Sequence, residues 1–172
     1  MTRAEFIEII ERLQNGDRSA LENVYNEMYS SLVMVAYRIT HNRQDAHDIA
    51  SDTILKLVDF KGNAHEIQNP IGYLVAATKN AAINFLKKRS HEISVPEVRP
   101  TVPEEYEDTL WMEDIVHLLT DGEWKIFIGY FICKETLISL AQKYHYSYVT
   151  VKRYKKSIKE KINREYKKSK EL

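Results

Sequence analysis

Residues 135–156 read ETLISLAQKYHYSYVTVKRYKK, and this stretch decides the fold of the last third of the chain. Its first half repeats apolar side chains at helical spacing, at Leu137, Leu140, Ala141 and Tyr144. These positions share one helical face, and the small Ala141 suits a close crossing of two helices. The pattern predicts a helix over residues 135–144.

A short turn and a second helix follow. The turn is His145-Tyr146-Ser147, and the Ser147 hydroxyl can cap the next helix by accepting a hydrogen bond from a free backbone N–H. The inward stripe of that helix is Val151, Tyr154 and Ile158. Together these signals predict a helix-turn-helix.

The outward face of the second helix is polar and basic. Its candidate DNA-binding side chains are Tyr148, Thr150, Lys152, Arg153, Lys155 and Lys156. Short polar and forked basic groups suit base edges, and ammonium groups suit phosphates. This favours a DNA-recognition helix. The alternative is a solvated charged helix in an ordinary helical hairpin.

Charge is segregated along the chain, although 25 basic and 25 acidic residues cancel overall. Residues 152–170 hold ten Lys and Arg against two Glu, whereas residues 91–114 hold eight acids against one Arg. A basic end attracts phosphates and an acidic segment repels them. The acidic segment is also suited to cover the basic helix in the free protein.

The pattern along the chain predicts an all-α fold of two small helical domains. Residues 1–90 and 110–172 carry helical periodicity. Between them, residues 91–109 are acidic, contain three prolines and show no period, which predicts a flexible linker.

Three helix starts are marked by capping signals. Thr2 and Glu5 form a capping-box pattern ahead of an apolar stripe that begins at Phe6. Asn42 is placed to start another helix, and Asn69-Pro70 combines a cap with proline at the first helical position. We expect helices to begin at each of these signals.

Several classes of protein are disfavoured by composition. No apolar run approaches the roughly 18–20 residues of a membrane span, and the N-terminal residues lack the order of a secretion signal. The single cysteine, Cys133, excludes an internal disulfide and is expected to be buried. We expect a cytoplasmic protein without membrane insertion.

Acidic residues at spacings of three and four share one helix face, at Asp45, Asp48 and Asp52. His41 and His47 are near enough in sequence that a metal site must be considered, but no second segment supplies ligands at a fitting spacing. We expect the acids and His47 to be exposed and to dock a protein partner. No phosphate loop or catalytic constellation is present, so neither enzyme activity nor a cofactor is expected.

A second nucleic-acid candidate is the helix predicted over residues 69–89. It gathers Lys79, Asn80, Asn84, Lys87 and Lys88 on or near one face. The preceding loop, residues 60–69, is polar, contains Phe60 and is suited to hold an unstacked base. The alternative is a polar helix face that is merely solvated.

The order of these parts resembles extracytoplasmic-function (ECF) sigma factors of bacterial RNA polymerase. The segments Ala20–Tyr25, Ala36–Ile39, Asp45–Ile49, Tyr73-Leu74 and Asn80–Lys88 look like their region two. The segment Thr150–Arg153 looks like their region four. The resemblance covers residues 17 to 166 and implies two helical domains joined by a linker.

The resemblance also implies roles for individual residues. Asp45, Asp48, Ser51 and Asp52 match the helix that docks on core polymerase. Lys79, Asn80 and Asn84 match the helix that meets the minus-ten element, and residues 60–69 match the loop that captures a flipped base. Thr150, Lys152, Arg153 and Lys156 match the helix that reads the minus-thirty-five element.

The chain departs from the family pattern at several positions. His47 stands where Glu is usual, Ser51-Asp52 replace Gln-Glu, and His145 replaces a glycine in the turn. A non-glycine residue in a left-handed turn costs roughly 1 kcal/mol or more. We therefore expect an altered polymerase contact and a modified turn.

The leading interpretation is a promoter-specificity subunit that binds core RNA polymerase and promoter DNA, with an anti-sigma factor as a further partner that the resemblance allows. One alternative is a helix-turn-helix regulator that acts without docking on core polymerase. Another is an adaptor that docks on polymerase without reading DNA. Lone regulators usually dimerise on palindromes, and the sequence shows no sustained heptad seam for that purpose.

Overall fold

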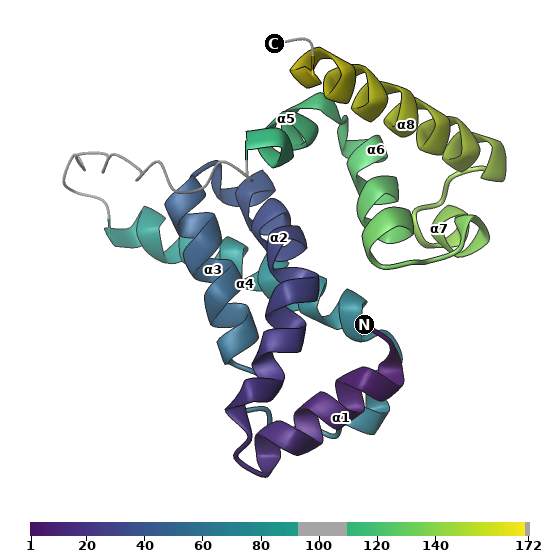
Figure 1. Ribbon diagram of the computed structural model, residues 1–172. Coiled ribbons are helices and arrows are strands. Elements are labelled where there is room, and N and C mark those ends of the chain that lie inside the picture. The colour runs from purple at the N-terminus through teal and green to yellow at the C-terminus, as the bar shows by residue number, and fades with distance from the viewer. Residues whose placement is uncertain (93–109, 171–172) are drawn as a thin grey trace. The chain divides into compact units, whose positions relative to one another are not determined.

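The computed structural model describes residues 1–92 and 110–170, with side chains for 1–89 and 114–167 (Figure 1). The chain divides into two compact units, residues 1–107 and 108–172, which are taken separately below. All regular elements in the described ranges are helical, as predicted. The predicted linker lies outside those ranges, except that its first two residues, His91 and Glu92, still belong to a helix.

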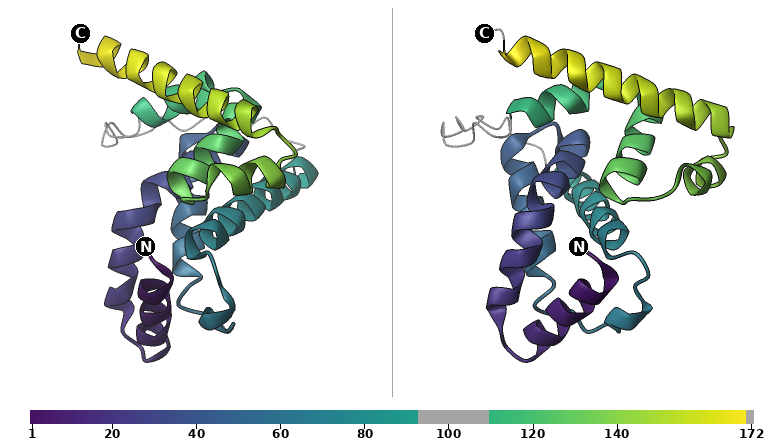
Figure 2. Two further views of the ribbon diagram at one scale, coloured as in Figure 1. Left: turned by 90° about the vertical axis from the view of Figure 1, so that its right-hand side faces the viewer. Right: turned by 45° about the vertical axis from the view of Figure 1, so that its right-hand side comes forward.

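The described part of unit 1, residues 1–92, contains four α-helices and two short 3₁₀ turns. They are α1 (Arg3–Gln14), η1 (Arg18–Ala20), α2 (Leu21–Thr40), α3 (Arg43–Leu55), η2 (Ala64–Glu66) and α4 (Pro70–Glu92). Within this unit α2 and α3 lie side by side and α4 packs against both (Figure 2). None of the helices in the described part of the chain is long and apolar enough to cross a membrane.

Local capping chemistry places the helix starts of unit 1 as predicted. The Thr2 hydroxyl accepts a hydrogen bond from the Glu5 N–H, and the Glu5 carboxylate accepts one from the Thr2 N–H. Asn42 caps α3 by accepting from the Asp45 N–H at 3.1 Å. Asn69 accepts from the Gly72 N–H at 2.8 Å at the start of α4.

The core of unit 1 is apolar. Its fully buried side chains include Phe6 and Ile10 from α1, Val24 and Leu32 from α2, Ile54 from α3 and Leu74 from α4. Two buried hydroxyls, on Thr53 and Thr78, donate to the carbonyls one turn earlier in their own helices. These two buried hydroxyls are therefore satisfied within their own helices, and the core between the helices is held by apolar packing.

Unit 2 is built around its longest helix. Its elements are α5 (Leu110–Leu118), α6 (Asp121–Ile126), the π-helical segment η4 (Phe127–Ile132), α7 (Leu137–Lys143) and α8 (Tyr148–Lys170). Helix α8 packs against α5, α6 and α7 (Figure 1). Of the predicted stripe, Val151 and Ile158 of α8 are fully buried at these contacts, whereas Tyr154 is half-buried.

The π-helical segment continues α6 with a wider turn. The Cys133 N–H donates to the Ile128 carbonyl at 2.8 Å, a five-residue spacing. Gly129 lies against Leu140 so closely that a Cβ there would come within 2.3 Å of a Leu140 methyl carbon. Of the predicted core aromatics, Phe127 is buried, whereas Trp124 and Phe131 are only half-buried. Burial raises the pKa of the Cys133 thiol to about 11, in agreement with the buried role predicted for it.

One buried carboxylate joins α6 to α8. Glu123 is 4% exposed, and it accepts from the Ser157 hydroxyl at 2.6 Å and from the Lys161 ammonium at 2.7 Å. It also closes a capping box with Thr120. Burial raises the pKa of the Glu123 carboxyl, but these hydrogen bonds outweigh that effect and lower the pKa to about 2. Unit 2 is therefore held together partly by charge.

Candidate nucleic-acid and protein interfaces

Helices α7 and α8, joined by a tight turn, occupy the segment that was predicted to be a helix-turn-helix. The Tyr146 N–H donates to the Ala141 carbonyl at 2.9 Å, and the His145 N–H donates to the Gln142 carbonyl at 3.3 Å. His145 adopts the left-handed conformation, with φ of 55°. These features define a Schellman motif, in which glycine is usual. The modified turn expected from this histidine is therefore not found: the backbone keeps the left-handed geometry, and His145 carries its conformational cost.

Ser147 caps α8 as predicted. Its hydroxyl oxygen accepts from the Thr150 N–H at 3.1 Å and lies 2.8 Å from the Thr150 hydroxyl. The first turn of α8 contains no acidic residue, unlike the first turns of α2, α3 and α6. An acid there would stabilise the helix but repel phosphate, so its absence leaves a positive helix end for an anion.

The predicted recognition face of α8 is only partly available to a ligand. Lys152, Arg153 and Lys156 are exposed, and the Lys152 ammonium lies 5.7 Å from the ring centroid of the half-exposed Tyr148. Lys155 behaves differently, because its ammonium donates to the Tyr130 hydroxyl at 2.6 Å and lies 4.0 Å from that ring centroid. Lys155 therefore belongs to the packing of α8 on η4 in this structure.

The acidic face of α3 is narrower than the sequence suggests. Asp48 and Asp52 are exposed, and Ser51 between them is half-buried. Asp45 forms an ion pair with Arg89 of α4 at 2.9 Å, and its side chain is only 16% exposed. The predicted set of four thus divides into two exposed acids, Asp48 and Asp52, and two residues that are only partly exposed, Asp45 and Ser51.

The expectation that His47 is exposed is wrong. His47 is buried, and its Nδ1 atom lies 2.7 Å from the Tyr29 hydroxyl of α2. The physical reason is that α3 buries a wide face against its neighbours, so a residue adjacent to Ala46 and one turn from Ala50 enters that face. His47 therefore joins α3 to α2 rather than extending the acidic surface.

Helix α4 presents its predicted polar residues to solvent. Lys79, Asn80, Asn84, Lys87 and Lys88 are all exposed. Three of them, Asn84, Lys87 and Lys88, line a groove of about 460 Å³ between α3 and α4. Asp52 and the aliphatic Ile49 line its α3 side, and Phe85 contributes an aromatic wall. The acidic and basic candidate surfaces of unit 1 therefore meet along one groove.

The loop of residues 60–69, which was predicted to hold an unstacked base, is braced by contacts with neighbouring helices. The ring of Phe60 packs edge to face on that of Tyr73 of α4, with 6.1 Å between the ring centroids, and the Tyr73 centroid lies 6.3 Å from that of Phe6 of α1. The Arg3 guanidinium donates to the His65 carbonyl at 2.5 Å. Sequence reasoning did not identify Arg3 or η2 as parts of this site, because a contact over 62 residues leaves no local signal.

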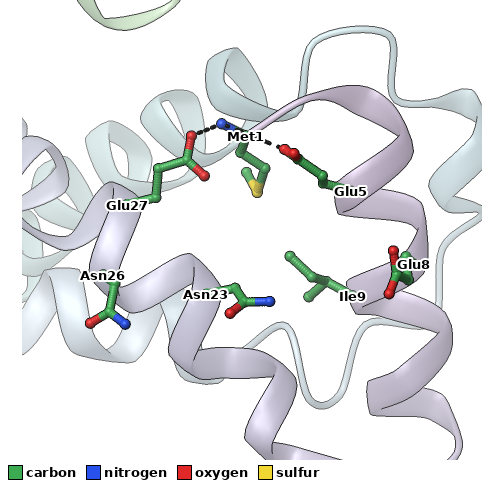
Figure 3. Close-up of a pocket in the computed structure, with 7 residues that line it drawn as sticks. All are labelled: Met1, Glu5, Glu8, Ile9, Asn23, Asn26 and Glu27. Carbon is green, nitrogen blue, oxygen red and sulfur yellow. Dashed lines mark ion pairs between the residues drawn. The ribbon is translucent and has the colours of Figure 1, made fainter.

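A separate acidic pocket of about 310 Å³ lies between α1 and α2 (Figure 3). It is lined by Met1, Glu5, Glu8, Ile9, Asn23, Asn26 and Glu27. The amino group of Met1 forms ion pairs with Glu27 and Glu5. Clustered carboxylates repel phosphate, so this pocket is no part of a nucleic-acid surface.

Comparison with known protein families connects this geometry to one of them. Residues 24–92 match the family model described as Sigma-70 region 2. The matched range includes α3 with its exposed acids, the braced loop and all of α4, and the helix-turn-helix lies beyond it. None of the curated proteins compared with the chain matches it. The matched family is non-catalytic, which agrees with the prediction that the chain is not an enzyme.

Proposed function

We propose that this chain, whose residues 24–92 match the Sigma-70 region 2 model, is a sigma-70 sigma factor and acts as a promoter-specificity subunit of the ECF type. In this proposal α3 docks on core RNA polymerase, α4 and the loop before it meet the minus-ten element, and α8 reads the minus-thirty-five element. The division of the chain into two units, with only helical elements in the described ranges, supports the ECF assignment.

The observation that carries the proposal is the arrangement of exposed groups on the region 2 domain. Asp48 and Asp52 face solvent from α3, whereas Lys79, Asn80 and Asn84 face solvent from the neighbouring α4. Exposed carboxylates cannot serve a DNA surface, so they suit a basic protein partner. Amides and ammonium groups suit bases and phosphates. One small domain thus offers surfaces for two different partners.

The proposed role of unit 2 rests on its own geometry. A capped helix follows a Schellman turn, its first turn lacks acids, and Lys152, Arg153 and Lys156 are exposed on it. These are the features of a helix that enters the major groove by its N-terminal end. A regulator that acts without polymerase is the second candidate, and the exposed acids of α3 would have no use in it.

Transcription in vitro with core polymerase on genomic fragments tests the proposal. The wild-type chain should start transcription at discrete sites, and Asp48→Arg should weaken its binding to core polymerase by tenfold or more, since charge reversal opposes a complementary surface. The matched control is Glu22→Arg, a reversal of an exposed acid on α2. Equal losses in the two variants, or no transcription by the wild-type chain, would contradict the proposed docking face.

A further inference from the structure

The outward face of α8 contains one aliphatic side chain that the proposed function leaves without a role. Val149 is 74% exposed, the highest value among the large hydrophobic residues that are exposed in the described part of the chain. It is the second residue of α8, directly after Tyr148. β-Branched residues have no helix-forming advantage at such a position, so neither packing nor local structure accounts for it.

Val149 lies in register with the exposed cations of the same helix. Lys152, Arg153 and Lys156 follow it by three, four and seven residues, which places all four on one helix face. The opposite face carries the buried Val151 and Ile158. The face therefore begins with an apolar group at the N-terminal end of α8 and continues with positive charge.

This order of groups matches the chemistry of the DNA major groove. The cations favour a polyanion as the partner of this face. A helix that enters the groove by its N-terminal end puts its first residues against base edges and its later residues near phosphates. Among the four standard bases only thymine shows a methyl group in the major groove. An exposed valine at the entering end has an apolar partner there only if the base is thymine.

We infer that Val149 is a specificity-determining residue that contacts a thymine methyl group in the upstream promoter element. The inference rests on the proposed reading role of α8. Adenine and cytosine would place amino groups, and guanine a carbonyl oxygen, against the valine without a hydrogen-bonding partner. Val149 thus selects thymine by attraction to its methyl group and by the penalty on the other bases.

The test uses the full chain bound to core polymerase. A duplex library that is randomised across the upstream element is first selected for binding, and each thymine of the selected element is then replaced by deoxyuridine, which lacks only the methyl group. Wild-type binding should fall about fourfold at one position facing the first turn of α8, the value expected for one buried methyl group. Replacement of that thymine by another base should cost tenfold or more.

Val149→Ala should abolish the thymine preference at that position and keep the selection made by Arg153 and its neighbours. Since Val149 is so exposed, the variant should fold normally, which its circular dichroism spectrum checks. The matched control is Ile138→Ala, an exposed aliphatic residue on α7 outside this face, with 62% exposure. This control should keep the fourfold difference between thymine and deoxyuridine.

The outcomes separate the inference from the function on which it rests. If the wild-type complex selects no upstream element, the reading role of α8 is wrong and the inference fails with it. If an element is selected but no thymine in it is sensitive to deoxyuridine, the inference alone fails. It also fails if Val149→Ala retains the full sensitivity, or if Ile138→Ala loses it.

Discussion

Helices α4 and α8 carry the two proposed DNA-contacting surfaces, but the balance of forces that holds them in place differs. Leu74, Thr78 and Ala82 anchor α4 and are completely buried, and its ion pair between Arg89 and Asp45 lies near its C-terminal end, where both side chains are partly exposed. Helix α8 buries Val151 and Ile158 but is also tied to its unit by charge, through the contacts of Lys155 and Lys161. Apolar packing is insensitive to protonation, whereas ionic contacts depend on pH. The two surfaces should therefore respond differently to the same change of conditions.

The chain provides a convenient means of observing this difference. Both of its tryptophans, Trp111 and Trp124, belong to unit 2. Tryptophan fluorescence of the intact protein therefore reports the unfolding of unit 2, whereas far-ultraviolet circular dichroism reports both units. Each prediction below uses this pair of measurements.

The largest effect is expected from Leu74→Ala in unit 1. Removal of a fully buried leucine side chain should lower the free energy of unfolding of that unit by about 3 kcal/mol, because it loses apolar burial and leaves a cavity. Urea titration followed by circular dichroism should show an early transition. The fluorescence transition should stay where it is in the wild type. A matching shift in fluorescence would show that the two units unfold together.

Acidification should lower the free energy of unfolding of unit 2 by a somewhat smaller amount than Leu74→Ala lowers that of unit 1. The pKa of Glu123 is lowered from 4.5 to about 2 in the folded unit, so its ionised form stabilises unit 2 above pH 4.5. That stabilisation is lost as pH falls from 4.5 through 2, and its total is on the order of 2–3 kcal/mol. The fluorescence-detected midpoint in urea should fall over this range.

Glu123→Gln provides the control for the acid effect. The amide keeps the size of the side chain but cannot ionise, so unit 2 should be less stable at neutral pH and its midpoint should change less between pH 4.5 and pH 2. A variant that keeps the full wild-type dependence would assign the acid effect to another group.

The smallest effect is expected from Tyr130→Phe. The substitution removes the hydrogen bond from Lys155 but keeps the ring beneath its ammonium group. The free energy of unfolding of unit 2 should fall by less than it does when the Glu123 carboxylate is protonated. A double-mutant cycle with Lys155→Met measures the coupling, and additive effects would show that the Tyr130–Lys155 contact contributes nothing.

Local signals in the sequence predicted the parts of this fold that depend on neighbouring residues. The caps at Thr2, Asn42 and Ser147 formed as expected, because each needs only a side chain and a backbone N–H three residues away. The position of the turn at His145 was also predicted, but its form was not, because the loss of glycine was expected to modify a turn whose backbone stays left-handed.

Features that depend on tertiary contacts were missed or mistaken. His47 was expected to be exposed because its acidic neighbours are polar, but its partner Tyr29 lies on another helix. The pairings of Asp45 with Arg89 and of Lys155 with Tyr130 span 44 and 25 residues. No periodicity encodes such pairs, so sequence reasoning overestimated how many of the charges on these helix faces are exposed.

The π-helical segment between α6 and α7 has an evolutionary consequence. A π turn holds one residue more than an α-helical turn, and one residue in an α-helix corresponds to about 100° of rotation. Deletion of a single codon within residues 127–132 would convert the segment to an ordinary α-helix and rotate the start of α7 relative to α6. Changes in the length of this segment should therefore be purged across descendants of the gene, and so should substitutions of Gly129, which leaves no room for a Cβ.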